Sequence, residues 1–445
     1  MKIVIKDATI VNERLSFRGS LLIVDGIIKS IFKDYIPVKN IGVDTIIDAS
    51  DLILIPGVID GHVHFREPGL TDKADIHSET VAAAAGGVTS FMDMPNTVPA
   101  ATTIDELEKK YETAKEKSLI NYSFYLGATN YNLDEIIKIN TENICGVKIF
   151  MGSSTGDMLA DDEKNMEKIF EQSPALIAVH CENDHIIKNN TEYFKTMFGS
   201  DIPFEYHDKI RTREACVTST EHAVALAYKH NSRLHILHVS TAKEAELLTC
   251  IDNKRISSET CPHYLWFSNS DYQSMKGFIK CNPSIKTQAD RDALRHAIAH
   301  GIIDTVATDH APHLLSEKSN NYLNCPSGLP SVQHSLNIML ELVRKKILTV
   351  ETVVECMCHN PARIFSIKNR GFIREGYKAD LILINPNAEW KVDKSNILYK
   401  CAWTPFENIT FNSKITHTFV NGNLVYCNGE IYENTKGERL IFERN

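Results

Sequence analysis

The sequence predicts an α/β fold in which a (β/α)8 barrel of the TIM type carries a small β-sandwich domain formed by both termini. Eight apolar runs of strand length recur through the middle of the chain, with amphipathic helical stretches between them. Strands that alternate with helices form a parallel barrel, and they are apolar because both of their faces are covered. We therefore assign residues 1–53 and 373–445 to the sandwich and residues 54–372 to the barrel.

Both ends of the chain show the pattern of short strands joined by tight turns. The N-terminal region contains "GSLLIVDGIIKSI", and the C-terminal region contains "KADLILINP" and "THTFVNGNLVYCNGEIY". Gly19, Gly26 and the "VNGN" sequence mark the turns. Because the two ends share this pattern, we expect them to meet in one domain, with the barrel inserted between them.

The barrel strands are predicted from eight runs in chain order. These are "LILIPGVID", "VTSFMDMP", "NYSFYLGAT", "GVKIFM", "ALIAVH", "RLHILHVS", "RISSETCPHYL" and "DTVATDHAPH". Between them, "TIDELEKKYETAKEK" and "ADRDALRHAIAH" are typical of amphipathic helices that cover such a barrel.

Composition narrows the range of functions. The net charge of −9 argues against a general nucleic-acid or anionic membrane surface. The N-terminus alternates apolar and charged residues and lacks a signal-peptide core, and no run is long enough to cross a bilayer. The eleven scattered cysteines are odd in number, which favours reduced thiols and a cytoplasmic location.

Ionisable or metal-binding side chains stand where several apolar runs end. Since barrel active sites lie at the carboxyl ends of the strands, these side chains are the candidates for function. In "DGHVHFREPG", two histidines and an arginine have the same strand parity, so the histidines could bind a metal and the arginine could reach its target. The full set is His62, His64, Lys148, His180, His238 and Asp309.

Each candidate also has a purely structural interpretation. A single histidine at a strand end is more often a hydrogen-bonded structural residue than a ligand. Lys148 could pair with a carboxylate inside the barrel, and Asp309 could cap the following helix. The convergence of four histidines, a lysine and an aspartate on one rim favours a metal site.

The motifs that carry these residues resemble the cyclic amidohydrolases, a family that includes dihydroorotases, allantoinases and hydantoinases. The resemblance runs from "KDATIVN" to "KADLILI", nearly the whole chain. It is carried by "PGVIDGHVHFREPG", "GVKIFM", "HCEN", "LHVST", "ETCPHYL" and "ATDHAPH". The pair "HVHFREPG" and "ATDHAPH" is similar to dihydroorotases in particular.

The resemblance implies a centre with two zinc ions that share a hydroxide. His62, His64 and Asp309 would hold one ion, and His180 and His238 would hold the other. Lys148 matches the family lysine that reacts with carbon dioxide, and its carbamate would bridge the metals. Asp157 in "SSTGDML" is a weaker alternative for the bridge.

The resemblance also implies the reaction, a reversible hydrolysis of L-dihydroorotate to N-carbamoyl-L-aspartate in pyrimidine biosynthesis. Asp309 would be the catalytic acid and base as well as a ligand. Arg66 offers a planar fork suited to the substrate carboxylate. The remaining substrate contacts would be Asn96, Asn282, His313 and the backbone near Gly328.

Several alternatives stay open. Arg66 could form an ordinary rim salt bridge, and Asn96 could serve a turn in "PNTVP". An allantoinase or hydantoinase would use the same metals, and a non-catalytic scaffold would keep the barrel alone. Ser284 and Lys286 in "NPSIK" replace the usual proline and arginine of the family. Relatives are commonly dimers or tetramers, so we expect a homo-oligomer.

Overall fold

The computed structural model describes residues 1–33, 42–151, 162–252 and 254–444. Its larger part is a sheet of eight strands in the order β6 to β13. Every neighbouring pair in it is parallel. A parallel bridge from Val63 to His310 links the first strand to the segment after the last one, so the barrel is nearly closed. The strands are β6 (Val58–Val63), β7 (Val88–Asp93), β8 (Asn121–Gly127), β9 (Gly146–Phe150), β10 (Ile177–His180), β11 (Leu234–Ile236), β12 (Ile256–Thr260) and β13 (Thr305–Val306).

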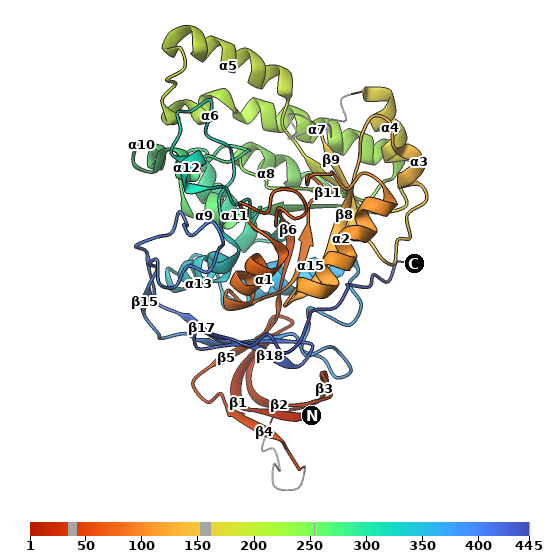
Figure 1. Ribbon diagram of the computed structural model, residues 1–445, viewed down its shortest axis with the longest axis vertical. Helices are drawn as coiled ribbons and strands as arrows, with labels where there is room; N and C mark the ends of the chain where they lie inside the picture. Colours follow the sequence, from red (N-terminus) through yellow and green to blue (C-terminus); the bar gives the residue numbers. More distant parts are fainter. Residues whose placement is uncertain (34–41, 152–161, 253, 445) are drawn as a thin grey trace.

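Helices surround the barrel and lie at its upper end in Figure 1. The helix at 104–117 illustrates how they pack, because Leu107, Tyr111 and Ala114 are buried on one face at helical spacing. The helices are α1 (Ile76–Ala85), α2 (Ile104–Lys117), α3 (Leu133–Ile136), α4 (Glu163–Gln172), α5 (Asp184–Phe198), α6 (His207–Ile210), α7 (Arg213–His230), α8 (Ala242–Thr249), α9 (Pro262–Trp266), α10 (Tyr272–Met275), α11 (Gln288–Ala299), α12 (Leu315–Lys318), α13 (Ser335–Arg344), α14 (Val350–Val354) and α15 (Asn360–Phe365).

The first predicted run proves to contain two strands that belong to different sheets. Residues 53–56 pair in the small sheet, and the barrel strand begins at Val58. Gly57 lies between them, and a Cβ at this position would stand 2.0 Å from Thr89 Oγ1. Only glycine therefore allows the chain to pass this close to β7 as it moves from one sheet to the other.

The two ends of the chain build one sheet of nine strands below the barrel (Figure 1), which confirms the predicted joint domain. β14 lies between β5 and β17, so C-terminal strands continue the N-terminal sheet. Apolar side chains from both ends form one cluster, so the sheet encloses a core of its own. The strands are β1 (Lys2–Asn12), β2 (Leu15–Val24), β3 (Ile27–Phe32), β4 (Thr45–Asp48), β5 (Ile53–Pro56), β14 (Leu381–Asn385), β17 (Lys414–Val420), β18 (Asn423–Cys427) and β19 (Glu430–Ile431).

Two C-terminal segments return to the barrel. The connection between β14 and β17 carries the short pair β15 (Trp390–Lys391) and β16 (Thr410–Phe411). Within this connection the Trp403 indole donates to the carbonyl oxygen of His313, 2.7 Å away. Residues 437–444 run beside the barrel, where Leu440 and Phe442 join a buried cluster with Tyr125. The C-terminal region thus supports the barrel as well as the small sheet.

Two predictions from composition can be compared with the structure directly. All eleven cysteines are in the described part of the chain, and all are free thiols. Among the described residues, no helix is both long enough and apolar enough to span a bilayer.

Candidate active site

The predicted site residues converge at the carboxyl ends of the barrel strands. His62 lies in β6 and His64 just beyond it, Lys148 lies in β9, and His180 ends β10. They line one cavity of about 220 Å³, a size that admits a single small ring compound. All eleven predicted positions line it, namely His62, His64, Arg66, Asn96, Lys148, His180, His238, Asn282, Asp309, His313 and Gly328.

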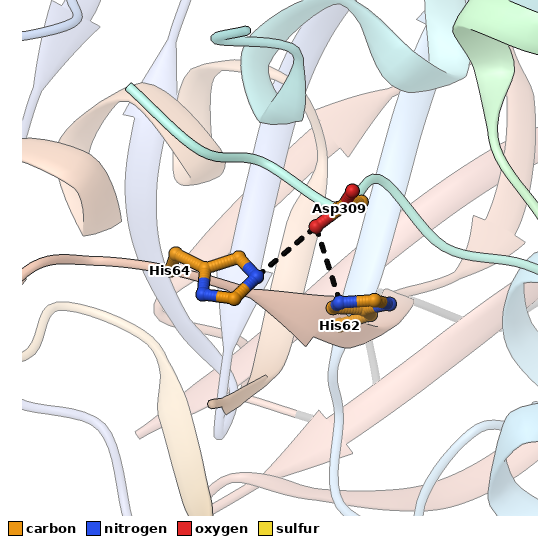
Figure 2. A group of neighbouring side chains, drawn as sticks. All are labelled: His62, His64 and Asp309. Atoms are coloured by element: carbon orange, nitrogen blue, oxygen red, sulfur yellow. Dashed lines mark hydrogen bonds and ion pairs between the residues drawn. The ribbon is translucent and has the colours of Figure 1, made fainter. Parts of the chain in front are cut away.

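One carboxylate oxygen joins the first three candidate ligands (Figure 2). Oδ1 of Asp309 is 3.1 Å from Nε2 of His62 and 3.0 Å from Nε2 of His64. The far nitrogens of the two rings are also held. Nδ1 of His62 is 2.6 Å from Glu259 Oε1, and Nδ1 of His64 is 2.8 Å from Asn96 Oδ1. A carboxylate or amide behind a histidine fixes its ring and tautomer, as is usual for metal ligands.

The second group lies beside the first. Nδ1 of His180 is 2.9 Å from Nε2 of His238, and the His238 ring centroid is 5.4 Å from that of His62. Nδ1 of His238 is buried and has no hydrogen-bond partner in the described part of the chain. The Lys148 amine lies 4.5 Å from the centre of the Phe150 ring, with no carboxylate at ion-pair distance among the described residues. This group therefore contains nitrogen atoms that a cation could engage.

The charges of the two groups differ. Burial disfavours a charged His62 ring, but Asp309 and Glu259 outweigh this and raise its pKa to about 9. Burial lowers the pKa of His180 and of His238, so both rings are neutral. Burial also lowers the pKa of Lys148 to about 7, although the same two carboxylates oppose the shift. The site thus favours positive charge between its carboxylates. Beside them it offers neutral imidazole nitrogens that could bind a metal.

Three of the candidate residues have left-handed backbone conformations. The φ angles are 66° at Arg66, 41° at His238 and 46° at Asp309. Such angles are uncommon for residues other than glycine and concentrate at functional sites, where the surroundings hold the strain. In Asp309 and His238 the unusual angle falls just after a strand and turns the side chain into the cavity.

The cavity is also lined by a buried cation, Arg66. Arg66 donates from Nε to the carbonyl oxygen of Pro312, 3.1 Å away, and its Nη2 lies 3.1 Å from Nε2 of His313. In the described ranges no carboxylate is within ion-pair distance of this guanidinium, which is only 7% exposed. Burial and the nearby Arg66 hold the pKa of His313 well below its usual value, so the ring is neutral. This wall is arranged to receive an anionic group.

The other predicted substrate contacts are more varied. Oδ1 of Asn282 is buried in the cavity wall with no hydrogen-bond partner among the described residues. Gly328 has a φ of 132°, and its N–H donates to the Lys280 carbonyl oxygen, 2.9 Å away. Its own carbonyl accepts from Lys318 Nζ at 2.7 Å. The backbone at Gly328 is therefore held in place by protein groups.

The family model described as the amidohydrolase family matches residues 53–425. The chain belongs to the amidohydrolase family. It is 32% identical to a dihydroorotase of Methanosphaera stadtmanae over 93% of this chain and 94% of that one. It is 28% identical to an allantoinase of Salmonella paratyphi B over 95% of each chain.

Solved amidohydrolase structures agree with the fold. The L-hydantoinase (dihydropyrimidinase) of Arthrobacter aurescens superposes with a TM-score of 0.92 at 26% identity, covering 97% of each chain. This likeness confirms the barrel with a separate sheet from the termini. Taken with the sequence relatives, it shows that this amidohydrolase is a cyclic amide hydrolase.

Two acidic residues of the amidohydrolase site were not predicted. Glu259 bridges His62 and His235, whose Nε2 is 3.1 Å from Glu259 Oε2. Glu182 forms a buried ion pair with Arg211 and lies 3.2 Å from Nε2 of His180. Strand parity offered a signal for Glu182, because it stands two residues after His180 in "HCEN" and so shares its side.

The two departures from the family pattern lie behind the cavity. Ser284 Oγ donates to the Arg211 carbonyl oxygen at 2.9 Å, and Lys286 Nζ lies 2.8 Å from Ser284 Oγ. Neither residue lines the cavity. Asp157, the alternative bridging residue, lies outside the described residues.

Proposed function

We propose that this amidohydrolase is a dihydroorotase, which hydrolyses L-dihydroorotate to N-carbamoyl-L-aspartate and closes the ring in the reverse direction. One observation carries the choice of substrate. Arg66 is a buried guanidinium at the cavity wall with no carboxylate at ion-pair distance in the described ranges. Dihydroorotate carries a carboxylate that could pair with this guanidinium. Allantoin and neutral hydantoins carry no carboxylate. The dihydroorotase relatives support the same choice.

Arg66 and His313 have the chemistry to bind this carboxylate. The His313 tautomer with its proton on Nε2 donates to the Ser327 carbonyl oxygen and accepts from Lys73 at Nδ1. In that tautomer the Nη2 protons of Arg66 are left for the substrate. An arginine–carboxylate pair of this kind is directional, so it would orient the ring as well as hold it.

The donor set fits two zinc ions. His62, His64 and Asp309 place their ligand atoms within 4.8 Å of one another, and His180 and His238 present neutral imidazoles beside them. Asp309 and Glu259 hold the pKa of His62 above its usual value, so these carboxylates favour a positive charge that a metal ion would supply. When bound, such ions polarise a carbonyl group and lower the pKa of water to about 7.

Lys148 is the residue that would complete the ligand set. An ammonium group cannot bind a metal, whereas a carbamate supplies two oxygens and a negative charge. Its neutral amine would add to carbon dioxide, forming a nitrogen–carbon bond and losing one proton. The absence of a carboxylate at ion-pair distance among the described residues keeps this amine free to react.

Asp309 would move the proton during hydrolysis. Water oxygen adds to the ring carbonyl carbon, the bond from this carbon to the ring nitrogen breaks, and a water proton ends on that nitrogen. Both histidines contact Oδ1 of Asp309, so we assign the proton transfer to Oδ2. The products are a new carboxylate and the terminal amide of the carbamoyl group.

Parallel turnover of L-dihydroorotate and allantoin by one zinc-loaded preparation tests the function. Turnover of dihydroorotate alone supports the proposal, and turnover of allantoin alone shows a different substrate on the same site. Activity on neither compound, with zinc bound, favours the non-catalytic scaffold or another cyclic amide.

Replacing the buried cation tests the substrate contact itself. Arg66→Met should raise the KM for dihydroorotate about 100-fold, since hydrogen bonds between charged groups contribute roughly 1.5–3 kcal/mol. The KM for a neutral hydantoin should change little. An equal loss with both compounds would show that Arg66 does not recognise the carboxylate. Arg291→Met, at a partly exposed arginine on α11, is the matched control.

A further inference from the structure

One wall of the active-site cavity is a segment of irregular backbone, residues 325–328. Pro326, Ser327 and Gly328 line the cavity. The four carbonyl oxygens of this wall segment all point toward donors on other parts of the protein. The Ser327 carbonyl is 3.0 Å from His313 Nε2, and the other three accept from two lysines.

Lys280 and Lys318 are those lysines. Lys280 Nζ donates to the carbonyl oxygens of Tyr322, at 2.7 Å, and Cys325, at 2.6 Å. Lys318 Nζ donates to Pro326, at 2.9 Å, to Gly328, at 2.7 Å, and to Lys280, at 3.1 Å. The three protons of the Lys318 ammonium therefore match three carbonyl oxygens.

Both lysines are unusual because of where they lie. Lys318 is 1% exposed and Lys280 is 7% exposed. Neither has a carboxylate at ion-pair distance in the described part of the chain. Burying an ammonium group without a counter-ion is costly, so a purely structural role would be met more cheaply by apolar side chains. The lysines do not line the cavity themselves, and their described hydrogen bonds go to backbone carbonyl oxygens in and around the wall.

The same contacts fix the innermost residue of the wall. The Lys280 carbonyl oxygen accepts from Lys318 and also from the N–H of Gly328. A Cβ on Gly328 would lie 2.7 Å from the Ala311 carbonyl oxygen, so the wall packs closely against the strand-end segment that follows Asp309. Movement of the two lysines would therefore move the wall relative to the catalytic aspartate.

We propose that Lys280 and Lys318 are positioning residues that hold the 325–328 wall in the conformation that receives the anionic substrate. The identity of the substrate in this inference rests on the proposed function. The effect of the lysines on the conformation of the wall does not. The described hydrogen bonds of the two lysines go to backbone carbonyl oxygens and not to the side chain of any candidate metal ligand. The lysines should therefore govern substrate binding and leave the chemical step nearly unchanged.

The test is Lys318→Met, which removes the three donors and keeps an apolar stem. The KM should rise about tenfold while kcat changes less than about threefold, because binding common to ground and transition states is lost. The measurement uses whichever cyclic amide the zinc-loaded protein turns over. Hydrogen exchange in the substrate-free protein should show faster exchange at the Gly328 amide, a readout that does not depend on activity.

Two further variants complete the design. Lys318→Gln restores two donors and should give an intermediate KM, and it carries the test if the methionine variant does not fold. Lys209→Met, at a lysine with an exposed side chain paired to Asp208, should leave KM unchanged.

The outcomes distinguish a failure of the proposal for the two lysines from a failure of the proposed function. Unchanged KM and unchanged exchange in a folded Lys318→Met variant overturn the proposal, and so does an equal fall in kcat with constant KM. If neither variant folds, exchange in the unaltered protein decides, since a rapidly exchanging Gly328 amide would show that the wall is not held. Lack of turnover with any cyclic amide would refute only the proposed function.

Discussion

Asp309 combines more roles than any other residue of the site. Its Oδ1 contacts two histidines, its backbone has a φ of 46°, and it follows the last strand of the barrel. His62, buried beside it, is itself held by Glu259 of β12, a strand that does not pair with β6. A change at Asp309 therefore disturbs both histidine contacts and, under the proposed function, the transfer of the proton.

Asp309→Asn should lower kcat by about 1000-fold or more, because the amide cannot carry the proton and is a poorer metal ligand. Turnover and zinc content should be measured on the same preparation. Asp292→Asn, at a half-exposed surface aspartate, is the control. An active variant with full zinc content would rule out Asp309 as the acid and base.

The chain motifs predicted the residues that line the cavity but not those that support them. His62, His180 and Asp309 stand at or just beyond the carboxyl ends of apolar strands, so their position alone places them at the rim. Glu259 and Lys318 could not be predicted in this way, because their role depends on which distant residues fold against them. The left-handed backbone angle at Asp309 could not be predicted either, since residues other than glycine adopt such angles only occasionally.

At the scale of elements, the segments after β10 and before α7 meet in a buried ion pair between Glu182 and Arg211. Burial would raise the Glu182 pKa, but Arg211 and His180 outweigh it and lower the pKa to about 2, against 4.5 for an ordinary glutamate. The ionised form therefore stabilises the fold above about pH 4.5, and this contribution is lost as the pH falls toward 2.

Glu182→Gln should lower the free energy of unfolding at pH 7 and flatten its decline between pH 5 and pH 3. Urea unfolding of both proteins across this range, at equal metal content, provides the measurement. Parallel curves for the two proteins would show that the carboxylate does not stabilise the fold.

Element boundaries were predicted well where the pattern was local. The helix at 104–117 and the hairpin turn at "VNGN" follow their sequence signals, and Asn421 and Gly422 in that turn both have positive φ. The split at Gly57 was missed, because the apolar residues on both sides fit a single strand, although the Pro56–Gly57 pair between them is a turn signal. Which sheet each half joins is decided by β14, far along the chain.

The close approach of the C-terminal segment to the barrel gives a prediction for one glycine. A Cβ on Gly437 would lie 1.8 Å from the Ile120 carbonyl oxygen. Gly437→Ala should cost about 1–3 kcal/mol of stability, because backbone must shift to admit the methyl group. Urea unfolding measures this loss, with the exposed neighbour Lys436→Ala as control. Equal free energies of unfolding for Gly437→Ala and the unaltered protein would show that the C-terminal segment can shift without cost.

At the scale of the whole molecule, the candidate metal ligands lie in or just after the barrel strands β6, β9, β10, β11 and β13. Removing bound metal with a chelator should lower the unfolding midpoint, because a ligand that binds only the folded state adds about 4 kcal/mol at a thousandfold excess over Kd. Thermal unfolding with and without zinc measures the shift. Asp309→Asn should show a smaller shift, and an unchanged midpoint in the unaltered protein would contradict a bound metal.

The pairing of β5 with β14 has a consequence for synthesis on the ribosome. Ile55 pairs with Ile382, so the barrel emerges before one edge of β5 can find its partner strand, although its other edge can already pair with β1. At roughly 5–20 residues per second, the wait is on the order of half a minute. During that interval the apolar edge of β5 is open to other chains, so cotranslational folding of this protein should depend on a holding chaperone more than folding of the barrel alone would.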